Sequence, residues 1–286
     1  MLGVTREHTL VTATPLKFIS PFFRISAYLP MRQPISMDIP LSDNKSVFIL
    51  KDGATSTKKY KLIVEKSCLK LFYGVFLPNL KERWLGSISS LGLKRNLQVP
   101  KENFVVVASG LQSIRINNAF NFSILPASVT LFFTKSKAEY GNWKNTKFAY
   151  ENVDVSNIRL FKSGLPLEFN KELSDLHVST RNGADHLFLY NQFVQLYGEK
   201  AAYETLESFF ADMFCYCIPL CRNPRVGNDY GIMPDPADRQ LSFGEAATLD
   251  IDFTFKTAPS EELICHVIGW YDIVVGFNEY GEILQD

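Results

Sequence analysis

Polar and apolar residues alternate strictly over residues 247–256. One face carries only apolar side chains and the other carries threonines, aspartates and a lysine; the apolar residues are Leu249, Ile251, Phe253 and Phe255. Strict alternation is typical of an antiparallel strand with one buried face. Residues 262–275 are apolar on both faces instead, which predicts a strand covered on both sides. Because residues 257–261 are turn formers, we expect the two strands to form a hairpin.

The same patterns predict six further strands and three helical segments. The strands are residues 60–76, 97–109, 112–122, 128–135, 153–162 and 214–220, with a bulge at Ser156-Asn157 and shorter candidates at 37–41 and 47–51. Helical spacing predicts a helix over 78–91 and a two-part helical region over 183–214. In the first part of that region the recurring apolar residues are Leu187, Tyr190, Phe193, Val194 and Tyr197. Residues 137–150 and 221–240 are expected to be loops that make contacts.

Eight antiparallel strands with long connections predict an all-β fold with inserted helices, an eight-stranded antiparallel jelly-roll sandwich. In chain order, strands one, eight, three and six would form one sheet, and strands two, seven, four and five the other. This order places residues 262–275 beside residues 60–76. The jelly-roll domain is expected over residues 58–286, with helical insertions at 78–91 and 183–214, after an N-terminal extension at 1–57.

Composition agrees with a large core and gives no sign of secretion. Of 286 residues, 46% are hydrophobic and 13% aromatic, 23 of them Phe, which favours strands. Arg6, Glu7 and His8 interrupt the N-terminus before an apolar run forms, so no signal peptide is predicted. No apolar run is long enough to span a membrane. Five unevenly spaced cysteines argue against a disulfide framework. We therefore expect an intracellular protein, in the nucleus or cytoplasm.

Charge is balanced overall but not along the chain. Residues 1–147 hold 21 Lys and Arg against 8 Asp and Glu, whereas residues 148–286 hold 9 against 22. One interpretation is that the two halves interleave and neutralise each other within one fold. The other is that a basic surface meets an acidic surface on a neighbouring copy and fixes the register between subunits.

Four cysteines and one histidine are candidate metal ligands. Cys215, Cys217 and Cys221 share one strand parity, and Cys265 with His266 lies elsewhere. Thiolates and imidazole are zinc ligands, but this spacing matches no zinc knuckle and the neighbouring residues are apolar. The sequence favours buried thiols, so no metal-binding residue is predicted.

Candidate general bases lack the motifs that accompany catalysis. His177 and His186 lie near Asp175 and Asp185, and His266 follows a cysteine, yet no serine elbow, phosphate loop or zincin motif is present. We predict no catalytic residue, no cofactor and no enzyme activity. The lysines of residues 58–70 alternate with apolar residues, which indicates a solvated strand face and no specific nucleic-acid site.

Several segments, in their order, resemble one family. They are residues 60–77 before the helix, 103–110, 125–133, 138–166 with Tyr140-Gly141-Asn142 and Lys147-Phe148, the 189–198 helix, and 244–284 with Tyr271-Asp272. This order resembles the double jelly-roll, hexon-like major capsid proteins of Maverick/Polinton elements and adintovirus-like genomes. The resemblance covers residues 37–286.

The resemblance implies a structural protein of a virion capsid. Such proteins form trimers in which two barrels per subunit make a pseudo-hexagonal capsomer, and they contact neighbouring capsomers and a minor (penton) capsid protein. This chain would supply the second barrel, with residues 1–57 as remnant strands of the first. A full family member is longer and carries two jelly rolls, and the family's acidic signature at the end of the sixth strand is replaced by Cys217, Ile218 and Pro219, which suggests a truncated or domesticated copy. The alternatives are a free-standing jelly-roll module that binds a glycan or host protein and, third, a cupin-type enzyme, which would need a histidine-rich strand motif.

Overall fold

A computed structural model describes ten parts of the chain. They are residues 38, 68, 77–91, 93–139, 149–167, 176, 183–197, 205–220, 242–277 and 283–284. Apart from residues 38 and 68, the strands predicted at 37–41, 47–51 and 60–76 lie outside the described residues, as does the loop at 221–240.

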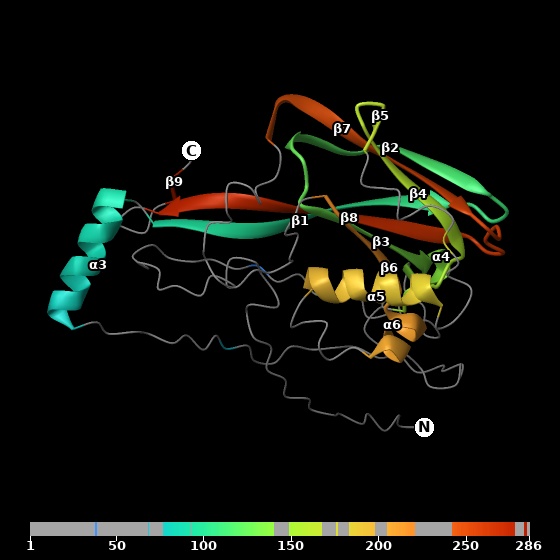
Figure 1. The fold of residues 1–286 in the computed structure, drawn as a ribbon, viewed down its shortest axis with the longest axis horizontal. Coiled ribbons are helices and arrows are strands. Elements are labelled where there is room, and N and C mark those ends of the chain that lie inside the picture. Colours follow the sequence, from blue (N-terminus) through green and yellow to red (C-terminus); the bar gives the residue numbers. More distant parts are fainter. Residues whose placement is uncertain are drawn as a thin grey trace, which may run out of the picture.

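Two antiparallel sheets lie face to face (Figure 1). The first, which we call the β8 sheet, has the order β1-β8-β3-β6, made by β1 (Leu93–Val107), β8 (Leu263–Phe277), β3 (Ser128–Lys135) and β6 (Cys215–Pro219). A short β9 (Ile283–Leu284) pairs with the end of β8. The second, the β7 sheet, has the order β2-β7-β4-β5, made by β2 (Ser113–Ile124), β7 (Ser242–Phe255), β4 (Val155–Lys162) and β5 (Leu165–Pro166). This strand order is that of a jelly roll and confirms the predicted fold class.

Seven strands, all except the short β5 and β9, lie near predicted positions, but their predicted neighbours are wrong. β8 lies between β1 and β3, whereas the sequence analysis placed residues 128–135 in the other sheet and residues 60–76 beside β8. Counting residues 60–76 as the first strand shifted the next four strands by one place in the order, and missing the short β5 restored the numbering from the sixth strand on. The predicted C-terminal hairpin is also wrong, because β7 and β8 belong to different sheets. Turn-forming residues predict that the chain reverses direction, but not that the two flanking strands form hydrogen bonds with each other.

Burial along β7 and β8 follows the predicted faces. On β7 the apolar residues from Leu249 to Phe255 are buried, while Thr248, Asp252 and Thr254 are partly exposed. Asp250 is the exception, buried where it accepts a 2.8 Å hydrogen bond from the Asn118 N–H. β8 is buried on both faces from Leu263 to Val267, as predicted. The predicted bulge in β4 is confirmed by a register shift between Val155 and Asn157.

Aromatic rings fill the space between the two sheets. Phe133 of β3 meets Phe253 and Phe255 of β7 edge to face, with ring centroids 5.5 and 5.9 Å apart. Tyr216 of β6 also packs on Phe133, and its hydroxyl donates a 2.7 Å hydrogen bond to the Val153 carbonyl. Burying each such side chain contributes roughly 1.5–3 kcal/mol, so this layer accounts for much of the stability of the sandwich.

Helices add a third layer on the outer face of the β8 sheet (Figure 1). α5 (Ala184–Tyr197) packs on β6, and α6 (Leu206–Asp212) begins at Thr205, whose hydroxyl accepts a 3.1 Å hydrogen bond from the Ser208 N–H. α5 buries His186, Leu189, Phe193 and Leu196, whereas Leu187 is 46% exposed. The predicted apolar face was therefore wrong at Leu187; the ring of His186 takes that inner position by packing on Phe210.

Two other helices flank the sandwich. α3 (Pro78–Leu91) has the predicted bounds and stands at the end of the β8 sheet where β1 begins (Figure 1). α4 (Ser136–Glu139) is one helical turn at the start of the segment predicted to be a loop, so that prediction is wrong for its first residues. This turn is held to the segment before β8, because Ser136 donates a 2.6 Å hydrogen bond to the Glu262 carboxylate.

Candidate functional site

The thiols lie on opposite faces of the β8 sheet. Cys215 and Cys217 project from the helix-covered face of β6, with their sulfur atoms 3.7 Å apart. Cys265 of β8 lies opposite Phe133 and therefore faces the β7 sheet. The sheet itself separates the two groups. Cys221, the third predicted member, lies outside the described residues.

The surroundings of Cys215 and Cys265 favour the protonated thiol. A hydrogen bond with Cys217, together with burial, raises the pKa of Cys215 well above its ordinary value. Burial alone raises the pKa of Cys265. A zinc site needs thiolates and three or four ligands, and the described residues contain no cluster of three or more His, Cys, Asp or Glu suited to a metal. The geometry thus supports buried thiols within the described part of the chain.

The candidate histidines occupy different environments. His186 is 2% exposed and packs its ring against Phe210 and Phe214, with the nearer centroid 3.9 Å away. His177 and Asp175 lie outside the described residues. His266 of β8 is buried beside polar groups from three other elements.

His266 ties four elements together. Its Nε2 lies 3.1 Å from Thr134 Oγ1 of β3 and 3.6 Å from a carboxylate oxygen of Glu139 in α4, while Nδ1 lies 3.0 Å from Glu102 Oε1 of β1. Its ring also stacks on Phe132, with centroids 4.6 Å apart. The sequence analysis named His266 but missed its partners, because strand register alone brings such distant residues together.

The order Thr134–His266–Glu102 is that of a hydrolase triad, in which a histidine joins a hydroxyl nucleophile to a carboxylate. A nucleophile must reach a substrate carbonyl, but Thr134 is 1% exposed. The arrangement therefore serves as a buried polar connection between strands, and its chemistry gives no argument for hydrolysis.

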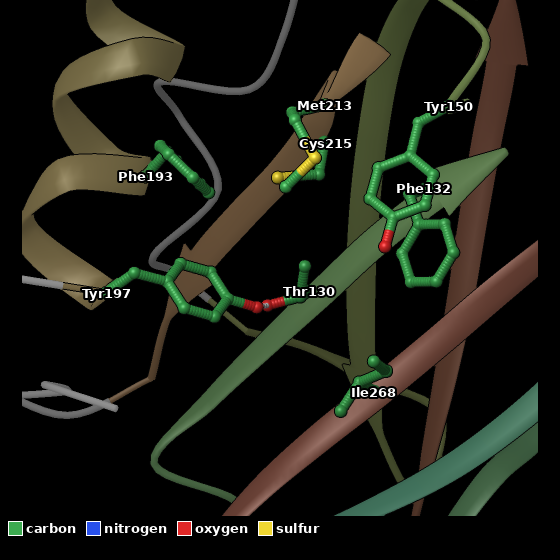
Figure 2. A pocket seen from close by; sticks show the side chains of 8 residues that line it. All are labelled: Thr130, Phe132, Tyr150, Phe193, Tyr197, Met213, Cys215 and Ile268. Carbon is green, nitrogen blue, oxygen red and sulfur yellow. Dashed lines mark hydrogen bonds between the residues drawn. The ribbon is translucent and has the colours of Figure 1, made fainter. Parts of the chain in front are cut away.

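A cavity of about 170 Å3 lies between α5 and the β8 sheet (Figure 2). It is lined by Thr130, Phe132, Tyr150, Phe193, Tyr197, Met213, Cys215 and Ile268. None of these side chains carries a formal charge at neutral pH. The hydroxyl groups of Tyr197 and Thr130 form a 3.1 Å hydrogen bond in its wall. The sequence analysis placed Phe193 and Tyr197 on a helix, but nothing in the local pattern indicates a cavity.

Exposed apolar side chains gather on the outer edge of the β8 sheet. Phe104 and Val106 of β1 are 64% and 50% exposed, and both lie on the face opposite the β7 sheet. Alternate residues Val105 and Val107 turn toward the core. We call Phe104 and Val106 the β1 patch. Large exposed apolar side chains on one face are candidates for contact with another protein.

Ion pairs join the basic half of the chain to the acidic half. Arg115 of β2 pairs with Asp250 of β7 at 3.4 Å, and Lys135 pairs with Glu261 at 2.7 Å and Glu151 at 3.8 Å. The Glu261 hydrogen bond is the main cause of a raised Lys135 pKa. These contacts support the interpretation that opposite charges interleave within one fold.

Comparison with known proteins gives a likeness of fold alone. No family model matches the chain, and no curated protein matches it. A chain of the Sputnik virophage is 14% identical, with a TM-score of 0.38 over 68% of this chain and 39% of that one. The mavirus major capsid protein is 10% identical, with a TM-score of 0.33 over 70% of this chain and 42% of that protein. The Faustovirus major capsid protein is 11% identical, with a TM-score of 0.40 over 69% of this chain and 36% of that protein.

The matched region spans about two fifths of the length of those proteins. The scores are low, so the jelly-roll assignment rests on the strand order of this chain. Among the described residues, no helix has the length and apolar character needed to cross a bilayer.

Proposed function

We propose that this chain is the second jelly roll of a double jelly-roll major capsid protein and acts as a structural subunit. It would self-associate into trimers, contact neighbouring capsomers and a penton protein, and reside in virions after assembly within the host cell. The proposal extends to the Maverick/Polinton and adintovirus type, in a truncated or domesticated copy, with residues 58–286 as the barrel and residues 1–57 as remnants of another. No enzyme activity or specific nucleic-acid site forms part of it.

The strand order carries the proposal. Two four-stranded sheets in the orders β1-β8-β3-β6 and β2-β7-β4-β5 form the double-sheet jelly roll found in viral capsid domains, lectins and cupins. The ordered motifs of the sequence support the first of these three classes. The long connection that holds α5 and α6 also agrees with a barrel elaborated for contacts outside the sandwich.

The interior of the sandwich argues against a cupin. A cupin-type enzyme would hold its metal and substrate between the two sheets, where Phe133, Phe253 and Tyr216 here meet ring against ring. Each of these side chains is 2% exposed or less. An interior packed in this way stabilises a building block better than it accommodates a substrate.

The β1 patch is the surface that we assign to a second copy. Phe104 and Val106 lie on the outermost described strand of the β8 sheet, so another subunit can approach them without moving the helices. Permanent subunit interfaces are larger and more apolar than transient ones, so the β1 patch would be one part of such an interface.

Light scattering after size exclusion, with negative-stain imaging, tests the proposal. We expect a trimer at roughly tens of micromolar protein, where weak transient contacts dissociate. Phe104→Ser should shift the protein toward monomer, whereas Leu165→Ser, at a 73% exposed position on the far sheet, should not. A folded parent that remains monomeric at this concentration would contradict the capsid role and favour the runner-up, a free-standing module that binds a glycan or host protein.

A further inference from the structure

The space beneath α5 has the dimensions and lining of a small-molecule site. Its volume is about 170 Å3, and its walls are aromatic rings, a thioether, a thiol and an aliphatic side chain. Apolar cavities of about 150 Å3 in proteins stay dry and accept a benzene-sized molecule. Size alone therefore limits an occupant to roughly one ring.

Two aromatic walls face each other across this space (Figure 2). On one side Phe132 and Tyr150 stack with ring centroids 4.2 Å apart. On the other, Phe193 and Tyr197 project from successive turns of α5, with centroids 5.1 Å apart. Because Phe132 also stacks on His266, it offers a guest its edge, and edge-to-face contact is one of the arrangements that aromatic groups prefer.

The electrostatics of the cavity exclude a charged occupant. Among the residues that the structure describes, no Asp, Glu, Lys, Arg or His lines it. Burial raises the pKa of Tyr197 well above its ordinary value and also raises that of Tyr150, so both phenols stay neutral. Thr130 and Tyr197 already satisfy each other through their 3.1 Å hydrogen bond. An ion entering here would lose its hydration without gaining a counter-charge.

We propose that this cavity binds one neutral, apolar, single-ring molecule. The site is reached without opening the sandwich, because Tyr150, Met213 and Ile268 at its boundary are only partly buried. It lies on a different part of the β8 sheet from the β1 patch, and its occupancy does not depend on the proposed capsid role.

Fluorobenzene is the probe, followed by 19F NMR during titration with the full-length protein. We expect saturable binding at one site with a dissociation constant of about 1 mM or tighter. Cys215→Phe places a ring of the ligand's own size in the cavity and should weaken binding at least about tenfold, a loss that corresponds to steric exclusion. The matched control, Leu187→Phe, adds the same ring on the exposed side of α5 and should bind as the parent does.

Three results would overturn the proposal: no saturable binding by the parent, equal binding by the Cys215→Phe variant, or an equal loss in the Leu187→Phe variant. If the Cys215→Phe variant does not fold, Phe193→Ala provides the opposite test by enlarging the cavity. That variant should bind 1-fluoronaphthalene more tightly than the parent does, by at least about fivefold. Unchanged or weaker binding would also refute the assignment.

Discussion

Two adjacent substitutions in β7 should have very different effects. Phe253 is 2% exposed, and its ring centroid lies 5.5 Å from that of Phe133 and 5.3 Å from that of Phe255. Phe253→Asp removes a ring whose loss alone costs about 3–5 kcal/mol, and it also buries a carboxylate with no partner. Because a whole domain is stable by about 5–15 kcal/mol, we expect this variant to have no cooperative folding transition at neutral pH.

Thr254→Asp points the new carboxylate to the other face. Thr254 is partly exposed and lies opposite Ser113 and Asn157, so the substitution displaces no ring and should cost about 0.5 kcal/mol or less. For a chain of this size the thermal midpoint should fall by no more than about 2 °C.

The assay is thermal unfolding of both variants beside the parent, followed by circular dichroism. Phe253→Leu is the matched control, since it keeps an apolar side chain and should retain a cooperative transition. An unfolded Thr254→Asp variant beside a folded Phe253→Asp variant would mean that β7 is displaced by one residue, because such a slip exchanges the two faces. The jelly-roll assignment would then lose its main support.

Three further predictions test the core. Gly269→Ala should destabilise by about 1–3 kcal/mol in urea unfolding, because its new methyl group would lie 3.1 Å from the Phe120 ring; an unchanged midpoint would show that the two sheets are less closely packed here. Zinc analysis after dialysis against a mild chelator should find no stoichiometric metal, and one retained equivalent that is lost on replacing Cys215 and Cys217 by Ser would contradict the buried-thiol interpretation. Peptide mapping after brief alkylation with a reagent larger than one ring should show the exposed Cys68 modified well before the buried Cys215 and Cys217; similar rates would mean that the outer face of β6 is open to solvent.

Local pattern was enough to predict the strands but not their partners. Period-two alternation in β7 and double-sided apolarity in β8 are properties of each segment, so their burial follows directly from the sequence. β1 pairs with β8 although most of the described chain separates them, and no local sequence pattern predicts which two strands pair. The error at Leu187 has a similar origin, since the inner face of α5 is decided by what α6 presents to it. The surroundings of His266 and the cavity beneath α5 both depend on register and packing between distant elements.

The strand order also determines when the protein can fold during its synthesis. β7 and β8 are inner strands of the two sheets, yet they come after their four main neighbours, β1, β2, β3 and β4, in the chain. Until residues 242–277 leave the ribosome, β1 is separated from β3 and β2 from β4, so neither sheet can close. Unpaired strand edges and exposed aromatic residues are then available to other nascent chains, and such long-range pairing is slow. The protein should therefore depend on chaperones during translation, and ribosomes stalled before β7 should carry an aggregation-prone chain.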